Sequence, residues 1–199
     1  MPRLILRVGM ARMVSATQRV RRPTGPVDRL RSWLRLEVLE GRCLPSTVTN
    51  LNDGGPGSLR DAIATTPFGG TVDFQPGLSG TITLTTGELD IFSNLTISGP
   101  GAHVIAVSGN HASRVFYTAA TVAMSGLTVT NGNSLDSGGG IYNASVLNLA
   151  DCNINGNTAR GPGSNGGGGI FNAGLLTITN SDVSDNSVPY RESMPLFCV

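Results

Sequence analysis

The chain has 199 residues, enough for one domain or for one domain with an appendage. Charged residues make up only 14% and aromatic residues only 5% of it, while Gly alone contributes 27 residues. Together with abundant Thr, Ser and Asn, this excludes a helical bundle, which is built from Leu, Ala, Glu and Lys. A hydrophobic content of 39% also excludes a fully disordered chain. Short strands joined by many tight turns fit this composition.

The net charge of +1 conceals a strong asymmetry. All fourteen basic residues are Arg, and ten of them lie in residues 1–46 beside only three acidic residues. The rest of the chain carries four Arg and ten acidic residues, so a basic arm precedes a mildly acidic body. Because the body has no basic stripe and no helix-turn-helix or RNA-binding motif, no nucleic-acid partner is expected.

The cysteines and histidines do not form a metal-binding pattern. The three Cys (Cys43, Cys152 and Cys198) are widely separated, and the two His (His103 and His111) lie in a turn-rich stretch. Since no ligand spacing typical of a metal site occurs, neither a metal nor a cofactor is expected. Cys152 falls in an alternating run and is interpreted as a small core residue.

The N-terminal 46 residues are predicted to be an Arg-rich leader that is mostly disordered. Apolar residues at helical spacing are compatible with a short helix over residues 27–40, which Gly41 would end. No run of apolar residues is long enough for a transmembrane segment. Arg7 and Arg12 interrupt the apolar runs near the start, so no clear signal peptide is present.

Residues 47–70 are predicted to cap the N-terminal end of the following domain. A turn cluster over residues 52–57 is followed by one to two helical turns, with Ser58 as the N-cap and Asp61 at the capping-box position. The glycine-rich loop before this helix lacks the Lys and Ser or Thr of a P-loop and the spacing of a dinucleotide fingerprint. Phosphate binding is therefore not expected there.

From residue 71 onward, apolar and polar residues alternate with a period of two, as in short strands. Val, Ile, Leu and Phe occupy most of the positions predicted to point inward, and Thr and Ser occupy the outward ones. The predicted strands cover residues 71–74, 81–85, 94–98, 114–117 and 127–130.

An internal repeat of 29 residues identifies the architecture. The segment Gly138–Ala144 recurs as Gly167–Ala173, and the match continues without gaps through Asn157 and Asn186. A unit of this length, made of short strands and Gly-Asn turns, predicts one coil of a parallel β-helix. We therefore expect an all-β, right-handed parallel β-helix over residues 71–187, with about four to five coils. Stacking would place Asn143 beside Asn172 in a side-chain ladder. Residues 188–199 have no repeat register.

Three motifs carry a resemblance to a known family. Residues Thr47–Ile63, residues Leu95–Gly101 and the Gly-Gly-Gly-Ile-Tyr-Asn repeat resemble bacterial right-handed parallel β-helix repeat proteins with the pectin-lyase-like fold, including polymorphic outer-membrane-type surface proteins. The segment Arg35–Pro45 is similar to a leader found before such domains. Because members usually carry more coils, the chain looks like a truncated member or a fragment of a larger protein.

The resemblance implies an exported or cell-surface protein with a structural or adhesive role, and polysaccharides or other cell-surface components as partners. The alternative, equally compatible with the fold, is a carbohydrate-active lyase or hydrolase. Enzymes of this fold gather acidic and basic residues in one groove along the coils. Here the candidates are Asp151, Asp182, Asp185 and Arg160, with Asp151 aligned to Asn180 and Asn153 aligned to Asp182. Each acid also fits a solvated turn residue that binds nearby backbone N–H groups, and this non-catalytic interpretation is preferred.

Overall fold

The computed structural model describes residues 45–160 and 166–189. They form a β-solenoid of about five turns built entirely from parallel strands, as the alternating pattern and the repeat predict. The expectations for the leader, including the helix over residues 27–40, lie outside the described residues, as does most of the segment 188–199.

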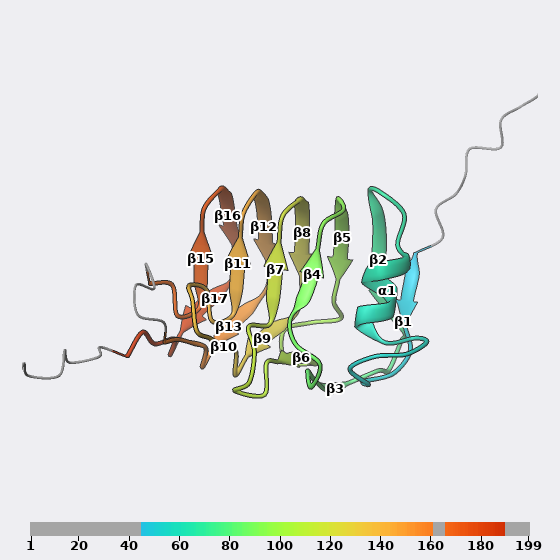
Figure 1. Ribbon diagram of the computed structural model, residues 1–199. Coiled ribbons are helices and arrows are strands. Elements are labelled where there is room, and N and C mark those ends of the chain that lie inside the picture. The colour runs from blue at the N-terminus through green and yellow to red at the C-terminus, as the bar shows by residue number, and fades with distance from the viewer. Residues whose placement is uncertain (1–44, 161–165, 190–199) are drawn as a thin grey trace, which may run out of the picture. The chain divides into compact units, whose positions relative to one another are not determined.

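Three parallel sheets form the walls of the solenoid (Figure 1). Sheet A comprises β1 (Ser46–Val48), β2 (Gly70–Phe74), β5 (Leu95–Ser98), β8 (Thr121–Ser125), β12 (Val146–Ala150) and β16 (Leu175–Thr179). Sheet B comprises β3 (Gly80–Thr83), β6 (Ile105–Ser108), β9 (Thr128–Thr130), β13 (Asn153–Asn155) and β17 (Asp182–Ser184). Sheet C comprises β4 (Leu89–Ile91), β7 (Phe116–Thr118), β11 (Ile141–Asn143) and β15 (Ile170–Asn172). A separate pair is formed by β10 (Asn133–Ser134) and β14 (Thr158–Ala159).

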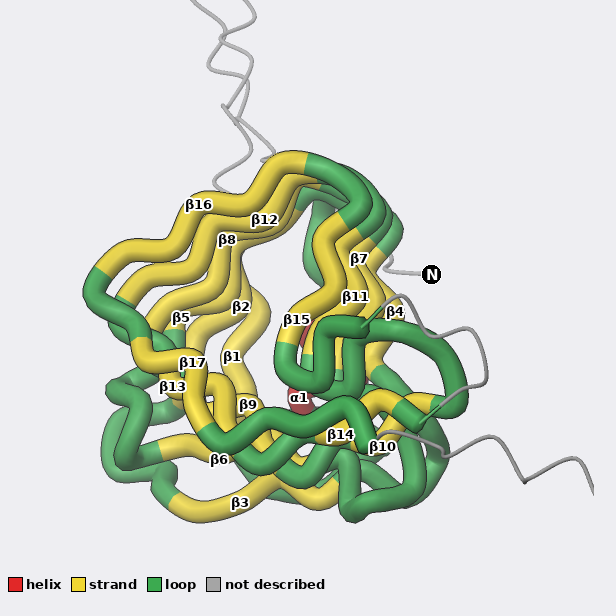
Figure 2. The backbone as a smooth tube through the Cα atoms, turned by 90° about the vertical axis from the view of Figure 1, so that its left-hand side faces the viewer, coloured by secondary structure: helices red, strands yellow, loops and turns green. Residues whose placement is uncertain are grey.

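Each turn of the solenoid runs from sheet A through sheet B to sheet C. Seen from the end that carries β15, β16 and β17, the chain circles counterclockwise as it advances toward the viewer, so the helix is right-handed (Figure 2). Successive turns take 25 to 29 residues, since Leu95, Val122, Leu147 and Leu176 are stacked partners in sheet A.

The last two turns reproduce the 29-residue repeat in their register. Ile141 pairs with Ile170, and Asn143 pairs with Asn172. The Val, Ile, Leu and Phe of alternate strand positions point inward and form one continuous core, in which Phe116, Ile141 and Leu147 are fully buried. Burial of this apolar column, at about 25 cal/mol per Å², is the main stabilising contribution.

The helix α1 (Leu59–Thr65) packs against the core near its N-terminal end and confirms the predicted helical turns. The hydroxyl of Ser58 accepts a hydrogen bond from the backbone N–H of Asp61, as an N-cap does. Leu59 and Ile63 bury their side chains in the core. In the chain, α1 lies between β1 and β2, where later turns have a sheet C strand between two sheet A strands.

The end of the solenoid at β15, β16 and β17 is different. Ile178 and Val183 of this last turn are 43% and 45% exposed, whereas Leu149 and Ile154, on which they stack, are 2% and 0% exposed. Among the described residues, no strand pairs with the outer edges of β15, β16 and β17. Within residues 45–160 and 166–189, no strand therefore covers the apolar column at this end.

Candidate functional site

Two of the predicted site residues, Asp151 and Asp182, lie in one shallow polar hollow at the corner between sheets A and B. The hollow has a volume of about 370 Å³. Its lining residues are Ala102, His103, Asp151, Cys152, Asn153, Asn180 and Asp182. Arg160 and Asp185 do not line it, so the structure brings together two of the four candidates.

The backbone gives a structural reason for Asp151. Its φ of 52° lies in the left-handed region, and it directly follows β12 at the corner toward sheet B. The residues at the same corner of the neighbouring turns, Gly126 and Asn180, have φ values of 61° and 46°. Gly, Asn and Asp are the residues that tolerate this conformation best. The turn geometry is therefore sufficient to explain an Asp at position 151.

Asp185 also has a left-handed backbone, at the corner that follows the sheet B strands. It has a φ of 53°, and the equivalent residues after β9 and β13, Asn131 and Gly156, have φ values of 50° and 63°. The remaining acid, Asp182, is exposed on β17 and accepts a hydrogen bond from the hydroxyl of Ser184 at 2.9 Å. Its backbone partner in sheet B is Asn153, in the predicted alignment.

Apart from Cys152, the titratable side chains around the hollow are exposed to solvent. His103, Asp151 and Asp182 are exposed, and none of them forms an ion pair with another described residue. Burial raises the pKa of the neighbouring Cys152 thiol, which keeps this side chain in its neutral form. Within residues 45–160 and 166–189, no group of three or more His, Cys, Asp or Glu is arranged to hold a metal ion.

Asparagine side chains form two ladders inside the turns. The amide nitrogen of Asn143 lies 2.7 Å from Oδ1 of Asn172, its acceptor, and the hydroxyl of Thr118 donates to Oδ1 of Asn143 at 3.1 Å. In the second ladder, which the sequence did not lead us to predict, the buried Asn157 donates to Oδ1 of Asn186 at 2.9 Å. Both ladders satisfy buried backbone groups and are structural.

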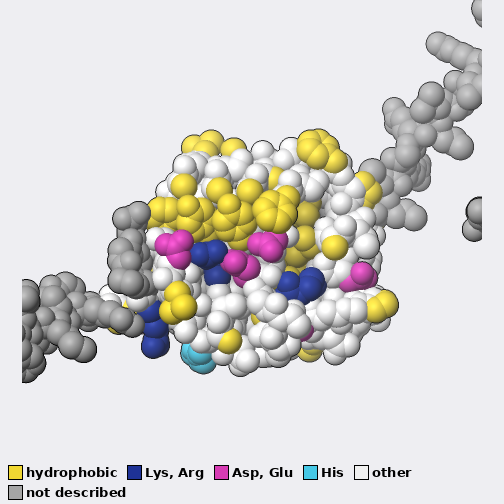
Figure 3. All heavy atoms as spheres, in the orientation of Figure 1, with side chains coloured by type: hydrophobic (Ala, Val, Ile, Leu, Met, Phe, Trp, Pro, Cys, Tyr) yellow, Lys and Arg dark blue, Asp and Glu magenta, His cyan; other side chains and the backbone are white. Residues whose placement is uncertain are grey.

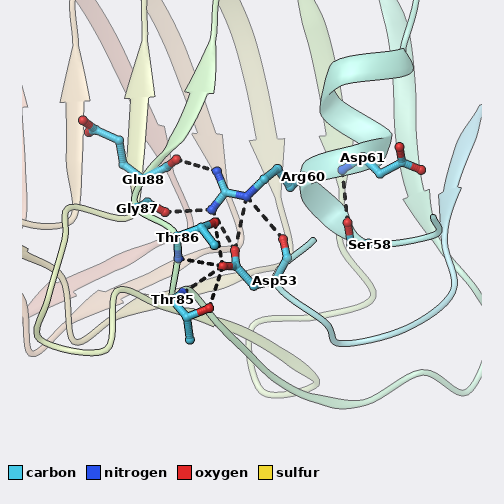
Figure 4. Close-up of polar contacts among 8 residues, drawn as sticks. All are labelled: Asp53, Ser58, Arg60, Asp61, Thr85, Thr86, Gly87 and Glu88. Carbon is cyan, nitrogen blue, oxygen red and sulfur yellow. Dashed lines mark hydrogen bonds and ion pairs between the residues drawn. The ribbon is translucent and has the colours of Figure 1, made fainter. Parts of the chain in front are cut away.

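A second polar cluster fastens the N-terminal end to the first full turn (Figure 4). The Arg60 guanidinium forms an ion pair with Asp53 at 2.7 Å and donates to the backbone carbonyls of Gly87 and Glu88. Asp53 also accepts hydrogen bonds from the backbone N–H and hydroxyl groups of Thr85 and Thr86. Burial by itself raises the pKa of Asp53, but these hydrogen bonds outweigh it and hold the pKa well below its usual range.

The outer face of sheet C carries a row of aromatic side chains along the solenoid. The ring centroids of Phe92 and Tyr117 are 5.9 Å apart, those of Tyr117 and Tyr142 are 5.3 Å apart, and those of Tyr142 and Phe171 are 5.0 Å apart. The sequence predicts Tyr142 and Phe171 at one repeat position, and the structure shows them as members of this longer outward row, partly exposed rather than in the core.

Charged side chains flank the aromatic row. The Arg114 guanidinium lies 5.1 Å from the ring centroid of Tyr142 and 6.0 Å from that of Tyr117, and it forms an ion pair with Glu88 at 2.7 Å. Figure 3 shows a band of hydrophobic side chains across this face with acidic and basic side chains beside it. Arg114 also donates to the backbone carbonyls of Ser137 and Gly138, which holds it against the sheet.

Comparison with known proteins finds no family model that matches this chain, and no curated protein or solved structure with significant similarity to it. Among the helices of the described residues, none is long and apolar enough to cross a membrane. The fold and the surfaces described above are therefore the basis of any functional assignment.

Proposed function

We propose that the chain is an exported or cell-surface β-solenoid with a structural and adhesive role, and that it binds through the outer face of sheet C. The observation that carries the proposal is the row formed by Phe92, Tyr117, Tyr142 and Phe171. A contiguous, partly exposed apolar band flanked by charges is typical of surfaces that contact another macromolecule.

The rigidity of this face supports an adhesive role. Tyr117 and Tyr142 stack, and Phe92 and Tyr142 pack as tilted pairs against Tyr117 and Phe171. Arg114 is held by Glu88 and by backbone carbonyls, so little side-chain freedom remains to be lost on contact. The planes of neighbouring rings differ by 24° to 55°, so the row is not one flat platform. A row of this shape suits broad contact with a partner better than sugar rings lying flat on each aromatic residue.

The bacterial origin and the pectin-lyase-like relationship belong to the same proposal. Their support is the combination of the motifs in residues 47–63 and 95–101 with the glycine-rich repeat, on a chain that folds as a parallel β-solenoid. Antibody labelling of intact cells of the source organism, compared with lysed cells, tests the location. Labelling only after lysis would contradict export.

The adhesive role is tested with beads coated with the 199-residue chain and passed over layers of peptidoglycan, collagen and hydrophobic glass. We expect retention under flow on at least one layer. A variant with Tyr117→Ser and Tyr142→Ser should lose most of it, while Thr96→Ser on the outer face of sheet A should not. Equal retention of both variants on every layer would contradict binding through the outer face of sheet C.

A carbohydrate-active function is the second candidate, and the observation favouring it is that Asp151 and Asp182 share one hollow with His103. A glycosidase needs two carboxyl groups about 5–9 Å apart on either side of the bond. Purified chain is assayed against pectate, alginate and neutral glucans, with and without calcium. Turnover that is lost in Asp182→Ala would establish this second function.

A further inference from the structure

The first strand of sheet C has an edge to which no described strand is bound. β4 pairs only with β7, and sheet C ends there. The backbone N–H of Leu89 donates to Val115, and the carbonyl of Ile91 accepts from Ala119, so both residues direct their polar groups toward β7. Strand geometry then directs the N–H and C=O of Asp90, between them, to the opposite side.

The side chain of Arg60 already binds one backbone group at this edge, as a neighbouring strand would. The carbonyl of Glu88 lies on the same side as the polar groups of Asp90, and the guanidinium of Arg60 from α1 donates to it at 2.7 Å (Figure 4). No hydrogen bond from a described residue reaches the backbone N–H or C=O of Asp90. In the part of the chain that the structure describes, one donor and one acceptor at the middle of β4 therefore have no hydrogen-bond partner.

An apolar hollow lies beside this open edge. It has a volume of about 300 Å³, which is roughly ten times the share of one water molecule in the liquid. Its lining residues are Ile63, Ala64, Asp90, Ile91, Phe92, Ser93 and Leu95, from α1, from β4 and from the chain leading into β5. Phe92 is 71% exposed, which is unusual for a phenylalanine.

The exposed carboxylate of Asp90 favours a basic side chain in a peptide bound at this edge. The side chain of Asp90 is exposed, alternates with the buried Leu89 and Ile91, and forms no ion pair with a described residue. In a strand added parallel to β4, the residue opposite Asp90 would point outward beside this carboxylate. Its two neighbours would point inward, toward the apolar hollow.

We propose that the edge of β4 is a docking site for an extended peptide segment of a partner protein, with a basic residue between two apolar residues. The segment adds a strand to sheet C. The N–H of Asp90 donates to one of its carbonyls, and the C=O of Asp90 accepts from one of its N–H groups. The apolar side chains enter the hollow against Ile91 and Leu95, and the basic side chain pairs with Asp90. The inference shares Phe92 with the aromatic row of the proposed adhesive face, so its tests use Ala64 and Asp90, which do not belong to the row.

The probe is a fluorescent heptapeptide that alternates Val and Arg, titrated into the 199-residue chain and followed by anisotropy. The same peptide with an N-methyl group on its central amides cannot donate to the edge, and it should bind about tenfold more weakly. Hydrogen exchange of the Asp90 amide should be fast in the free chain and should slow on peptide binding. Equal binding of the two peptides, or unchanged exchange at Asp90, would overturn the proposal.

Variants separate the contributions. Ala64→Trp fills the hollow from the exposed side of α1 and should abolish peptide binding without unfolding the core. Asp90→Asn keeps the backbone edge but removes the charge, so affinity should fall about threefold and lose part of its dependence on salt. Asp136→Asn, a charge change on an exposed loop, is the matched control and should leave affinity unchanged.

Other occupants give different results. Protection of the Asp90 amide that rises with protein concentration, without peptide, would assign the edge to a second copy of the chain. Protection at every concentration would show that the chain covers the edge itself. Either result overturns a partner peptide as the occupant. Because Ala64 and Asp90 lie outside the aromatic row, these outcomes are distinct from failure of the bead-adhesion test.

Discussion

The side-chain amide of Asn143 donates a hydrogen bond to Oδ1 of Asn172 at 2.7 Å, across two turns of the solenoid whose sequences repeat at a spacing of 29 residues. Asn143 is fully buried, and its own Oδ1 accepts from the backbone N–H of Ser145 and from the hydroxyl of Thr118. Asn172, in the last turn, is exposed. The same residue type thus occupies equivalent positions with different burial.

This difference predicts different costs of substitution. Asn143→Ala leaves buried partners without hydrogen bonds and should lower the free energy of unfolding by about 2–4 kcal/mol. Asn172→Ala exposes its partners to water and should cost less than about 1 kcal/mol. Urea denaturation of both variants measures this. Equal losses would mean that the ladder is not what stabilises this position.

The corner geometry predicts that Asp151 can be replaced by residues that accept a left-handed backbone. Asp151→Asn and Asp151→Gly should change stability by about 0.5 kcal/mol or less, whereas Asp151→Val should cost about 1–2 kcal/mol because of its branched side chain. Thermal unfolding followed by circular dichroism compares the three variants. Tolerance of Val would contradict the backbone explanation for this acid.

The low pKa of Asp53 predicts a contribution to acid stability. Because its pKa is depressed in the folded state, the group adds stability above the unfolded value of about 4, and this is lost as pH falls below that value. Asp53→Asn should therefore lower stability at pH 7 and flatten its decline between about pH 4 and pH 2. Denaturant titrations over this range give the result, with Asp136→Asn as the control. A parallel decline in wild type and Asp53→Asn would show that the cluster with Arg60 does not contribute.

The open end of the solenoid predicts self-association of the 199-residue chain. Exposed inward-facing side chains and unpaired strand edges favour edge-to-edge contact. A charge placed there, as in Val183→Lys, should reduce light scattering at high protein concentration with little loss of stability. Ile154→Lys, one turn further in, should unfold the protein because its side chain is fully buried. A wild-type chain that stays monomeric at high concentration would contradict this prediction.

Much of the fold could be predicted because its determinants are local. The alternation in residues 71–74 and 94–98 is that of β2 and β5, and Ser58 indicates where α1 begins. The repeat also predicts the stacked register of β11 on β15. The strands β4 and β6 were not predicted, although the equally short β3, β7 and β9 were. Alternation over three or four residues is a weak signal, so it identifies such strands unevenly.

The candidate site could be predicted only in part. The repeat brings Asp151 and Asp182 close, but the left-handed φ of Asp151 and Asp185 becomes evident only when several turns are compared in three dimensions. Arg160 was a candidate because enzymes of the resembling fold combine acidic and basic residues in one groove, and it does not line the hollow of Asp151 and Asp182.

The sequence by itself determined that the chain forms a parallel β-solenoid, and it determined the register of the last two turns, because alternation and a gapless 29-residue repeat require no knowledge of distant contacts. Only the tertiary structure decided that Phe92 and Tyr117 continue the row of Tyr142 and Phe171, and that Arg114 reaches Glu88. It also decided that no described strand pairs with the edge of β4 beside α1. The physical reason is that earlier turns take 25 or 27 residues instead of 29, so loops of unequal length set which side chains stack, and no fixed spacing in the sequence records it.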